Sequence, residues 1–199
     1  MRTRLAQVLA AEIAQVAARA RDWVVAVRAG GHGGGSGVIW SADGLVVTNH
    51  HVARFSRAEI VLPDGQRVSG QVVQRAPEHD LAVLRIAAPG PLPPARPRAV
   101  ETLRVGEIAL AVGNPFGQRG AVAFGLVTGL GRATWTGQQP SPVIVADLTL
   151  YPGNSGGALL DAEGRLLGLT TMVMPPGIAL AIPASTVAAR LREWGLAEG

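Results

Sequence analysis

The segment Pro152 to Ala158 reads PGNSGGA and sets one serine, Ser155, among three glycines. A serine hydroxyl is a weak nucleophile at neutral pH, so it needs a nearby base and donors for the charge that develops on a carbonyl oxygen. Glycines beside the serine let the backbone turn sharply, so that successive N–H groups can point into one small space. We therefore expect a nucleophile at Ser155, with the Gly153 and Ser155 N–H groups as oxyanion donors.

The same segment also fits the G-x-S-x-G nucleophile elbow of α/β-hydrolases, in which the histidine follows the serine along the chain. Here all four histidines, His32, His50, His51 and His79, precede Ser155. The order His, Asp, Ser is instead that of the chymotrypsin-type arrangement. Chain order therefore excludes the elbow for any site whose base is a histidine.

A general base is expected from Thr48-Asn49-His50-His51-Val52, at the end of a predicted strand. Adjacent side chains point to opposite faces of a continuing strand, so only one of His50 and His51 can reach the serine. The local pattern leaves open which one it is.

The carboxylate that orients the base is expected at Asp80, which opens the apolar strand DLAVLRI. From there it can accept a hydrogen bond from one imidazole nitrogen and fix the tautomer. Other aspartates are expected to have structural roles. Asp43 and Asp64 precede glycines in predicted turns, and Asp147 is expected to hold the backbone before the serine loop in place.

Two other kinds of site compete with this triad. His50 or His51 with His79 and Asp80 could bind zinc, but no H-E-x-x-H or comparable spacing is present. The Gly30 to Gly37 stretch lacks the Lys-Ser/Thr ending of a phosphate loop, and no helix follows it. We predict no metal site, no cofactor and a flexible or tightly turning loop at Gly30 to Gly37.

Short strands separated by turns predict an all-β fold, a sandwich or barrels, with a helix at each end. Leu5, Val8, Leu9, Ile13 and Val16 form an apolar stripe at helical spacing near the N-terminus. Five prolines between residues 89 and 97 indicate a connector between two halves. A final helix is expected from Ser185 as N-cap, ending at Gly195.

The composition is that of a globular chain, because 48% of the 199 residues are hydrophobic and 16% are charged. The net charge is +4, and every Lys-or-Arg position is an arginine. These arginines are scattered along the chain, so we predict no nucleic-acid binding. No window is apolar for long enough to span a membrane. There is no cysteine, so the fold needs no oxidising compartment. Glu12 and Arg19 interrupt the apolar N-terminal stretch, so no signal peptide is predicted and the sequence alone favours the cytoplasm.

Taken together, these motifs give a sequence that resembles the protease domain of the HtrA/DegP family of trypsin-like serine peptidases. The matching segments cover nearly the whole chain in the right order: GSGVI from Gly35, GLVVTNHHV from Gly44, DLAVLRI from Asp80, VGNPFG from Val112, Gly125 to Leu130, Asp147, PGNSGGA from Pro152 and AIP from Ala181.

The resemblance implies two six-stranded antiparallel β-barrels in a single domain, 1–199. Its expected parts are a helix at 1–20, a barrel at 22–88, a connector at 89–103, a barrel at 104–184 and a helix at 185–197. It also implies His51, directly before the valine, as the base, with Asp80 as its orienter and Ser155 as the nucleophile. The oxyanion loop becomes Gly153, Asn154 and Ser155.

Substrate preference follows from the position six residues before the nucleophile, where a carboxylate selects Arg or Lys in trypsin-like relatives. That position is Thr149 here. We expect an apolar pocket that takes Val, Ala, Leu or Ile before the cleaved bond. Its expected walls are Thr149, Leu150, Leu169, Thr170 and Thr171.

The implied activity is acyl transfer to water by a serine endopeptidase acting on unfolded or misfolded polypeptides. A resting, chaperone-like binding module and an esterase remain as alternatives. Family trimers use the N-terminal region, so the first helix either joins copies of the chain or covers a barrel. The family also implies a periplasmic or other extracytoplasmic location, and the chain leaves no room for a PDZ domain after its last helix.

Overall fold

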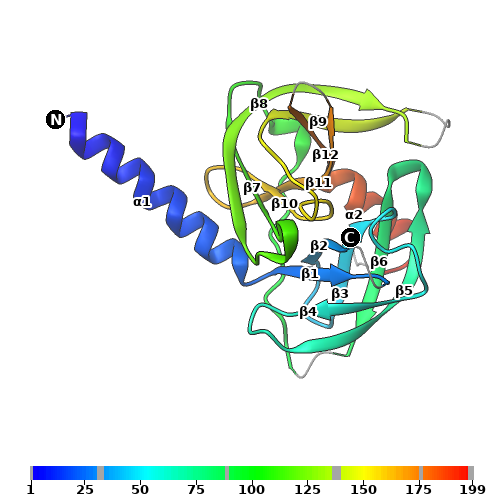
Figure 1. Ribbon diagram of the computed structural model, residues 1–199. Coiled ribbons are helices and arrows are strands. Elements are labelled where there is room, and N and C mark those ends of the chain that lie inside the picture. The colour runs from blue at the N-terminus through cyan, green and yellow to red at the C-terminus, as the bar shows by residue number, and fades with distance from the viewer. Residues whose placement is uncertain (1, 31–33, 88–89, 136–139, 175–176, 197–199) are drawn as a thin grey trace.

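The computed structural model describes residues 2–30, 34–87, 90–135, 140–174 and 177–196, and its strands form two closed antiparallel barrels (Figure 1). The first barrel has the strand order β1-β2-β3-β6-β5-β4. Its strands are β1 (Val24–Arg28), β2 (Gly34–Ile39), β3 (Leu45–Asn49), β4 (Arg57–Val61), β5 (Arg67–Ala76) and β6 (Leu81–Ile86). A short 3-10 helix, η1 (Pro77–His79), separates the last two strands.

The second barrel has the strand order β10-β11-β12-β9-β8-β7. Its strands are β7 (Ile108–Gly113), β8 (Ala121–Ala133), β9 (Ser141–Asp147), β10 (Ala158–Leu160), β11 (Leu166–Met174) and β12 (Ile178–Pro183). Two further 3-10 helices, η2 (Val100–Thr102) and η3 (Pro115–Gly117), flank β7. The expected fold class, two six-stranded antiparallel barrels with a helix at each end, is confirmed.

The hydrophobic core is shared between the barrels. One cluster of buried residues fills the first barrel and also includes Leu110, Val112 and Leu160 from the second. A separate cluster, with Ile144 and Leu167 among its members, fills the second barrel. Because burying apolar area is the main favourable term in folding, the shared cluster fixes how the barrels meet. Residues on facing loops of the two barrels are thereby held in a common cleft.

The first helix, α1 (Arg2–Arg21), packs on the barrels only through its C-terminal half. Val16, Ala17 and Ala20 are buried, whereas Val8 and Leu9 are exposed. The N-terminal half projects away from both barrels (Figure 1). Of the predicted apolar stripe, Val16 is therefore covered, whereas Val8 and Leu9 are not. At the C-terminal end of the helix, Arg21 Nε donates to the Gly120 carbonyl oxygen at 2.9 Å, which ties the helix to the second barrel.

The final helix, α2 (Ala184–Glu193), begins one residue earlier than predicted. Pro183, not Ser185, stands at its N-cap, and no side chain caps it. Proline suits this place because its ring fixes φ. Its missing N–H does no harm here, because the strand ladder of β12 ends at this residue. Gly195, at φ +64°, follows the C-terminus as expected, because the left-handed conformation there favours glycine.

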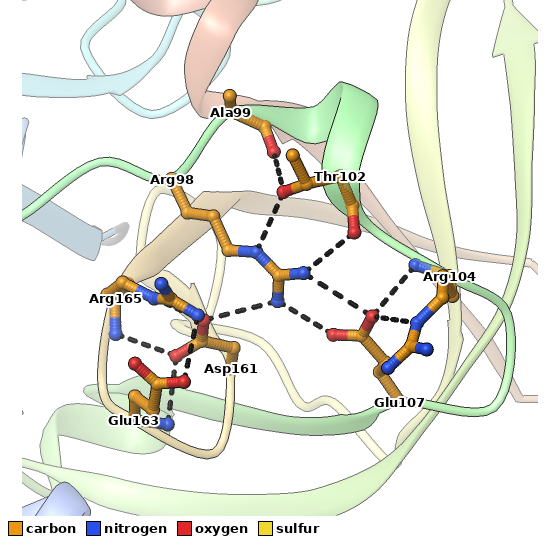
Figure 2. A network of polar contacts seen from close by, with 8 residues as sticks. All are labelled: Arg98, Ala99, Thr102, Arg104, Glu107, Asp161, Glu163 and Arg165. Atoms are coloured by element: carbon orange, nitrogen blue, oxygen red, sulfur yellow. Dashed lines mark hydrogen bonds and ion pairs between the residues drawn. The ribbon is translucent and has the colours of Figure 1, made fainter.

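The proline-rich connector is tied to the second barrel by an ion-pair network around Arg98 (Figure 2). The Arg98 guanidinium donates to Glu107 at 2.7 Å and to Asp161 at 3.2 Å. Glu107 also accepts from Arg104 at 3.0 Å, and Asp161 from Arg165 at 2.8 Å. The Arg98 and Arg104 donors lower the pKa of Glu107 from 4.5 to about 2. The connector is therefore held by charge pairs as well as by the Pro97–Leu166 bridge.

Among the residues that the structure describes, no helix is both long and apolar enough to cross a membrane.

Candidate active site

His51 and Asp80 come from neighbouring loops at one end of the first barrel. His51 follows β3 and Asp80 precedes β6, and these two strands pair antiparallel. His51 Nδ1 lies 2.8 Å from Asp80 Oδ2 and 3.0 Å from Oδ1. The His51 main-chain N–H also donates to Oδ1, at 3.0 Å. A carboxylate on Nδ1 places the ring proton there and leaves Nε2 as the acceptor, which is the tautomer a general base requires.

The Asp80 carboxylate is buried and is fixed from two sides. Its backbone is left-handed, at φ 50° and ψ 40°, a conformation that aspartate tolerates better than most residues. Its main-chain oxygen accepts from His50 N at 2.9 Å. From the second barrel the Thr171 hydroxyl donates to Oδ2 at 2.6 Å. The carboxylate therefore bonds to both barrels at once.

Ser155 lies across the cleft from His51, in the loop before β10, and both residues line a cavity of about 560 Å³. The Ser155 hydroxyl donates to the Thr171 main-chain oxygen at 2.9 Å. Among the described residues, no hydrogen bond joins Ser155 to His51. Ser155 and His51 thus share a cavity, but the serine side chain is turned toward β11.

The Pro152 to Ser155 backbone is held by hydrogen bonds and by a glycine at positive φ. Gly153 has φ +103°, and a Cβ atom there would lie 2.6 Å from the Asn114 main-chain oxygen, so only glycine fits. The Pro152 carbonyl accepts from Phe116 N at 3.0 Å. The Asn154 N–H donates to Tyr151 O at 3.0 Å, so Asn154 does not supply an oxyanion donor. The N–H groups of Gly153 and Ser155 have no acceptor within the described part of the chain.

A second cavity, of about 230 Å³, lies beside Ser155 on the side of β11. Its lining residues are Leu150, Tyr151, Pro152, Asn154, Ser155, Thr171 and Val173. Leu150 and Thr171 were predicted, but Thr149, Leu169 and Thr170 do not line this cavity. Leu169 is fully buried in the core, Thr149 is exposed, and the Thr170 hydroxyl donates to Asn154 O at 2.7 Å. No acidic side chain is among the lining residues.

The two other histidines near the site have separate surroundings. Burial and the nearby Arg75 guanidinium lower the pKa of His50. His79 contacts the Ser141 hydroxyl through Nδ1, and Arg190 donates to its Nε2 at 2.6 Å. Burial, then Arg190, lowers the pKa of His79. His79 therefore bridges the first barrel to β9 and α2.

Sequence reasoning missed the residues that support the site from a distance in the chain. Ser36 hydrogen-bonds the Ser155 loop, Asn114 hydrogen-bonds Ser36, and Tyr151 and Val173 complete the small cavity. The available signal was weak: Ser36 is the polar residue of GSGVI, and Asn114 is that of VGNPFG.

The family comparison matches residues 35–169 to the trypsin-like peptidase domain. This range is more than half of the chain and includes His51, Asp80 and Ser155.

Curated relatives are serine proteases that are longer than this chain. The periplasmic serine endoprotease DegP of Escherichia coli (strain K12) is 37% identical over 174 residues, which cover 79% of this chain and 37% of DegP. The chloroplastic Protease Do-like 1 of Arabidopsis thaliana is 39% identical over 165 residues, covering 78% of this chain and 38% of the relative. The chain therefore spans less than two fifths of the length of these relatives.

Solved structures give the same assignment. The HtrA-type protease AlgW with a tripeptide has a TM-score of 0.84 and 34% identity, covering 94% of this chain and 64% of that one. AlgW with a decapeptide gives 0.81 and 30%, covering 90% and 66%. With the family match, the relatives and the cleft in agreement, the chain belongs to the trypsin-like peptidases, in their HtrA/DegP branch.

Proposed function

We propose that this chain is a serine endopeptidase that hydrolyses peptide bonds in unfolded or misfolded polypeptides. The observation that carries this proposal is the shared cavity: His51 and Ser155 line it together, while Asp80 binds His51 Nδ1 at 2.8 Å. In this reading His51 is the general base, Asp80 orients it, and Ser155 is the nucleophile.

The reaction begins when the Ser155 side chain rotates from Thr171 O toward His51 Nε2. Its oxygen attacks the substrate carbonyl carbon, its proton passes to His51, and the carbonyl oxygen takes the negative charge. The N–H groups of Gly153 and Ser155 donate to that oxygen. His51 then gives the proton to the leaving amine, which departs as the peptide C–N bond breaks. Water repeats the sequence on the acyl-enzyme, with His51 again as base.

The small cavity beside Ser155 supports a preference for apolar residues before the cleaved bond. Leu150 and Val173 contribute apolar walls, and the lining residues carry no carboxylate that would pair with Arg or Lys. Burying a charged side chain without a partner carries a large desolvation cost. Val, Ala, Leu and Ile fit these walls without that cost.

Hydrolysis of unfolded casein by the purified chain, beside a Ser155→Ala variant, tests the activity. The wild type should release peptides, and the variant should lose about a thousandfold or more in rate. A matched control is Ser69→Ala, a serine of β5 on the first barrel. Equal hydrolysis by the wild type and Ser155→Ala would overturn the proposal.

A resting protein-binding module is the second candidate, and the Ser155–Thr171 hydrogen bond favours it. In that case the chain would bind unfolded polypeptide without cleaving it, and Ser155→Ala would change nothing. Cleavage of small esters but not of casein would indicate the esterase alternative instead.

We also infer polypeptides as the partners, because the relatives are named as endoproteases, and an extracytoplasmic location, because DegP is named as periplasmic. The projecting half of α1, with Val8 and Leu9 exposed, is the part available for a trimer contact. Size-exclusion chromatography of the wild type and of a Val8→Asp, Leu9→Asp variant tests this. A trimer in the first and a monomer in the second support it, whereas equal sizes contradict it.

A further inference from the structure

Ser36 is a buried polar residue in the middle of β2, on the barrel opposite to the one that carries Ser155. Its side chain is fully inaccessible to solvent. Gly35 and Gly37 flank it, and at Gly35 a Cβ atom would lie 2.7 Å from the Ser155 main-chain oxygen. The glycine thus lets β2 approach the serine loop more closely than any other residue would.

The direction of the Ser36 hydroxyl proton is fixed by its three partners. Two of them are donors: the Asn114 main-chain N–H at 2.8 Å and the Asn114 Nδ2 amide at 3.2 Å. The amide orientation is set because Nδ2 also donates to Val25 O and Oδ1 accepts from Gly120 N. A hydroxyl has one proton and two lone pairs. Ser36 Oγ therefore gives its one proton to Gly153 O, 2.8 Å away.

The Ser36 backbone holds the same loop at a second point. Its N–H donates to Ser155 O at 2.7 Å, and its own carbonyl accepts from Thr48 Oγ1 at 2.6 Å. One residue of β2 thus binds the carbonyls of both Gly153 and Ser155, on either side of Asn154. Within the described part of the chain, both donors of Ser36, its hydroxyl and its N–H, therefore bond to the Ser155 loop.

These contacts matter because the C=O and N–H of a trans peptide point in opposite directions. The Pro152 carbonyl is held by Phe116 N, and the Asn154 carbonyl by Thr170 Oγ1 and Gly157 N. By holding these two carbonyls, the hydrogen bonds set the directions of the N–H groups of Gly153 and Ser155. The alternate carbonyls, of Gly153 and Ser155, are the two held by Ser36. All four consecutive peptides of the loop are therefore held. Ser36 binds the carbonyls of two of them, whose N–H groups donate to Tyr151 O and Thr170 O.

We propose that Ser36 is a positioning residue for the oxyanion hole, acting across the barrel interface on the Gly153 to Ser155 backbone. The inference rests on the proposed peptidase function, since the hole matters only for acyl transfer. Without its hydroxyl, the Gly153 carbonyl and the Asn114 N–H lose their partner, and the Gly153–Asn154 peptide keeps only the bond from Asn154 N–H to Tyr151 O. The Gly153 backbone, which also carries an oxyanion N–H, is then held less tightly between its two peptides.

Ser36→Ala should lower kcat roughly 10- to 100-fold with little change in KM, less than the loss from deleting an oxyanion donor outright. The second readout is the labelling rate with a fluorophosphonate, which needs no substrate pocket. In that reaction the Ser155 oxygen–phosphorus bond forms, fluoride leaves, the serine proton passes to His51, and the phosphoryl oxygen occupies the oxyanion hole. The labelling rate should fall by the same factor as kcat.

The third readout separates positioning from loss of folding. A product-length peptide should bind equally to Ser155→Ala and to the Ser36→Ala, Ser155→Ala double variant. Ser141→Ala is the matched control, because it also deletes a buried hydroxyl, one that donates to Glu78 O at 3.1 Å. It should lower stability and leave both rates unchanged. Equal rate losses in Ser36→Ala and Ser141→Ala would overturn the inference, as would an unchanged rate in Ser36→Ala.

The two proposals fail in different ways. If the wild type cleaves no polypeptide but reacts with the fluorophosphonate, the proposed function fails and the labelling rates still decide the role of Ser36. If the wild type cleaves casein and Ser36→Ala cleaves it as fast, the function stands and the inference is wrong. A chain inert to both substrate and fluorophosphonate contradicts both.

Discussion

Ser155 donates its hydroxyl proton to the main-chain oxygen of Thr171, and the Thr171 hydroxyl donates to Asp80 Oδ2, at 2.9 Å and 2.6 Å. One residue of β11 thus contacts both the proposed nucleophile and the carboxylate proposed to orient the base. In the proposed reaction the serine must leave this oxygen before it can reach His51. Thr171 therefore links the two halves of the proposed triad.

Thr171→Val should lower kcat about tenfold, because it removes a hydrogen bond to a charged group and leaves the shape of the side chain nearly unchanged. Steady-state kinetics with a peptide substrate measures the effect. Thr149→Val is the control, since Thr149 is exposed and does not line the cavity. If both variants keep wild-type kcat, Thr171 has no part in holding Asp80.

Asp80→Asn should lower kcat roughly 10⁴-fold, because an amide facing Nδ1 favours the wrong imidazole tautomer. The new amide would also face the Thr171 hydroxyl, which donates to the carboxylate in the wild type. Asp43→Asn, on the exposed β2–β3 turn, is the control and should keep full activity. A loss of less than tenfold would mean that Asp80 does not orient the base.

Peptide substrates with Val before the cleaved bond should be cleaved with a kcat/KM at least roughly tenfold above those with Arg. Leu150→Asp should narrow or reverse that ratio, because it would add a carboxylate to a cavity wall that has none. Chromogenic peptides that differ in this one residue measure it. Faster cleavage after Arg by the wild type would show that the small cavity does not select the substrate.

His79 should make stability depend on pH below about 6.5, its ordinary pKa. Its pKa is lowered in the folded protein, so the unfolded chain takes up the proton first and stability falls as pH drops through and below 6.5. Protonation would also put a positive charge on the ring beside the Arg190 guanidinium, although Glu78 and Glu193 nearby favour the charged form. Urea midpoints from about pH 7.5 to 5 should fall more steeply for the wild type than for His79→Gln. Parallel curves would contradict this role.

Glu107 should contribute stability above its ordinary pKa of 4.5 that is lost as pH falls through about 2. The sign follows because the folded pKa is the lower one, so acid favours the unfolded chain. Glu107→Gln should be less stable than the wild type by a constant amount above about pH 5, and the difference should shrink in acid. Glu163→Gln is the control, because its pair with Arg165 is exposed and such pairs contribute little. A difference that does not vary with pH would exclude the charge pairs as its cause.

Local patterns in the sequence were enough to predict an all-β fold, a sandwich or barrels, and the residue types of the site. The choice of two six-stranded barrels came from the resemblance to the HtrA/DegP family. Asp43-Gly44 and Asp64-Gly65 form turns with both glycines at positive φ, and the apolar runs between turns became strands. These features depend on neighbours in the chain, so sequence alone carries them. The same holds for the glycines around Ser155. The order of His51, Asp80 and Ser155 along the chain is also a property of the sequence, and it excluded the hydrolase elbow.

The partners of these residues were decided by the tertiary structure. Ser36 meets Gly153 across 117 positions, Thr171 meets Asp80 across 91 and His79 meets Arg190 across 111. The tertiary structure also decided the pocket walls, because of the three consecutive β11 residues expected there only Thr171 lines the small cavity. The register of β11 against β12 shifts between Thr170 and Met172, so Thr171 does not follow the alternation and its hydroxyl reaches Asp80. The bulge arises in the pairing of β11 with β12, and the Thr171 hydroxyl bonds a residue 91 positions away, so no local pattern in the sequence encodes either.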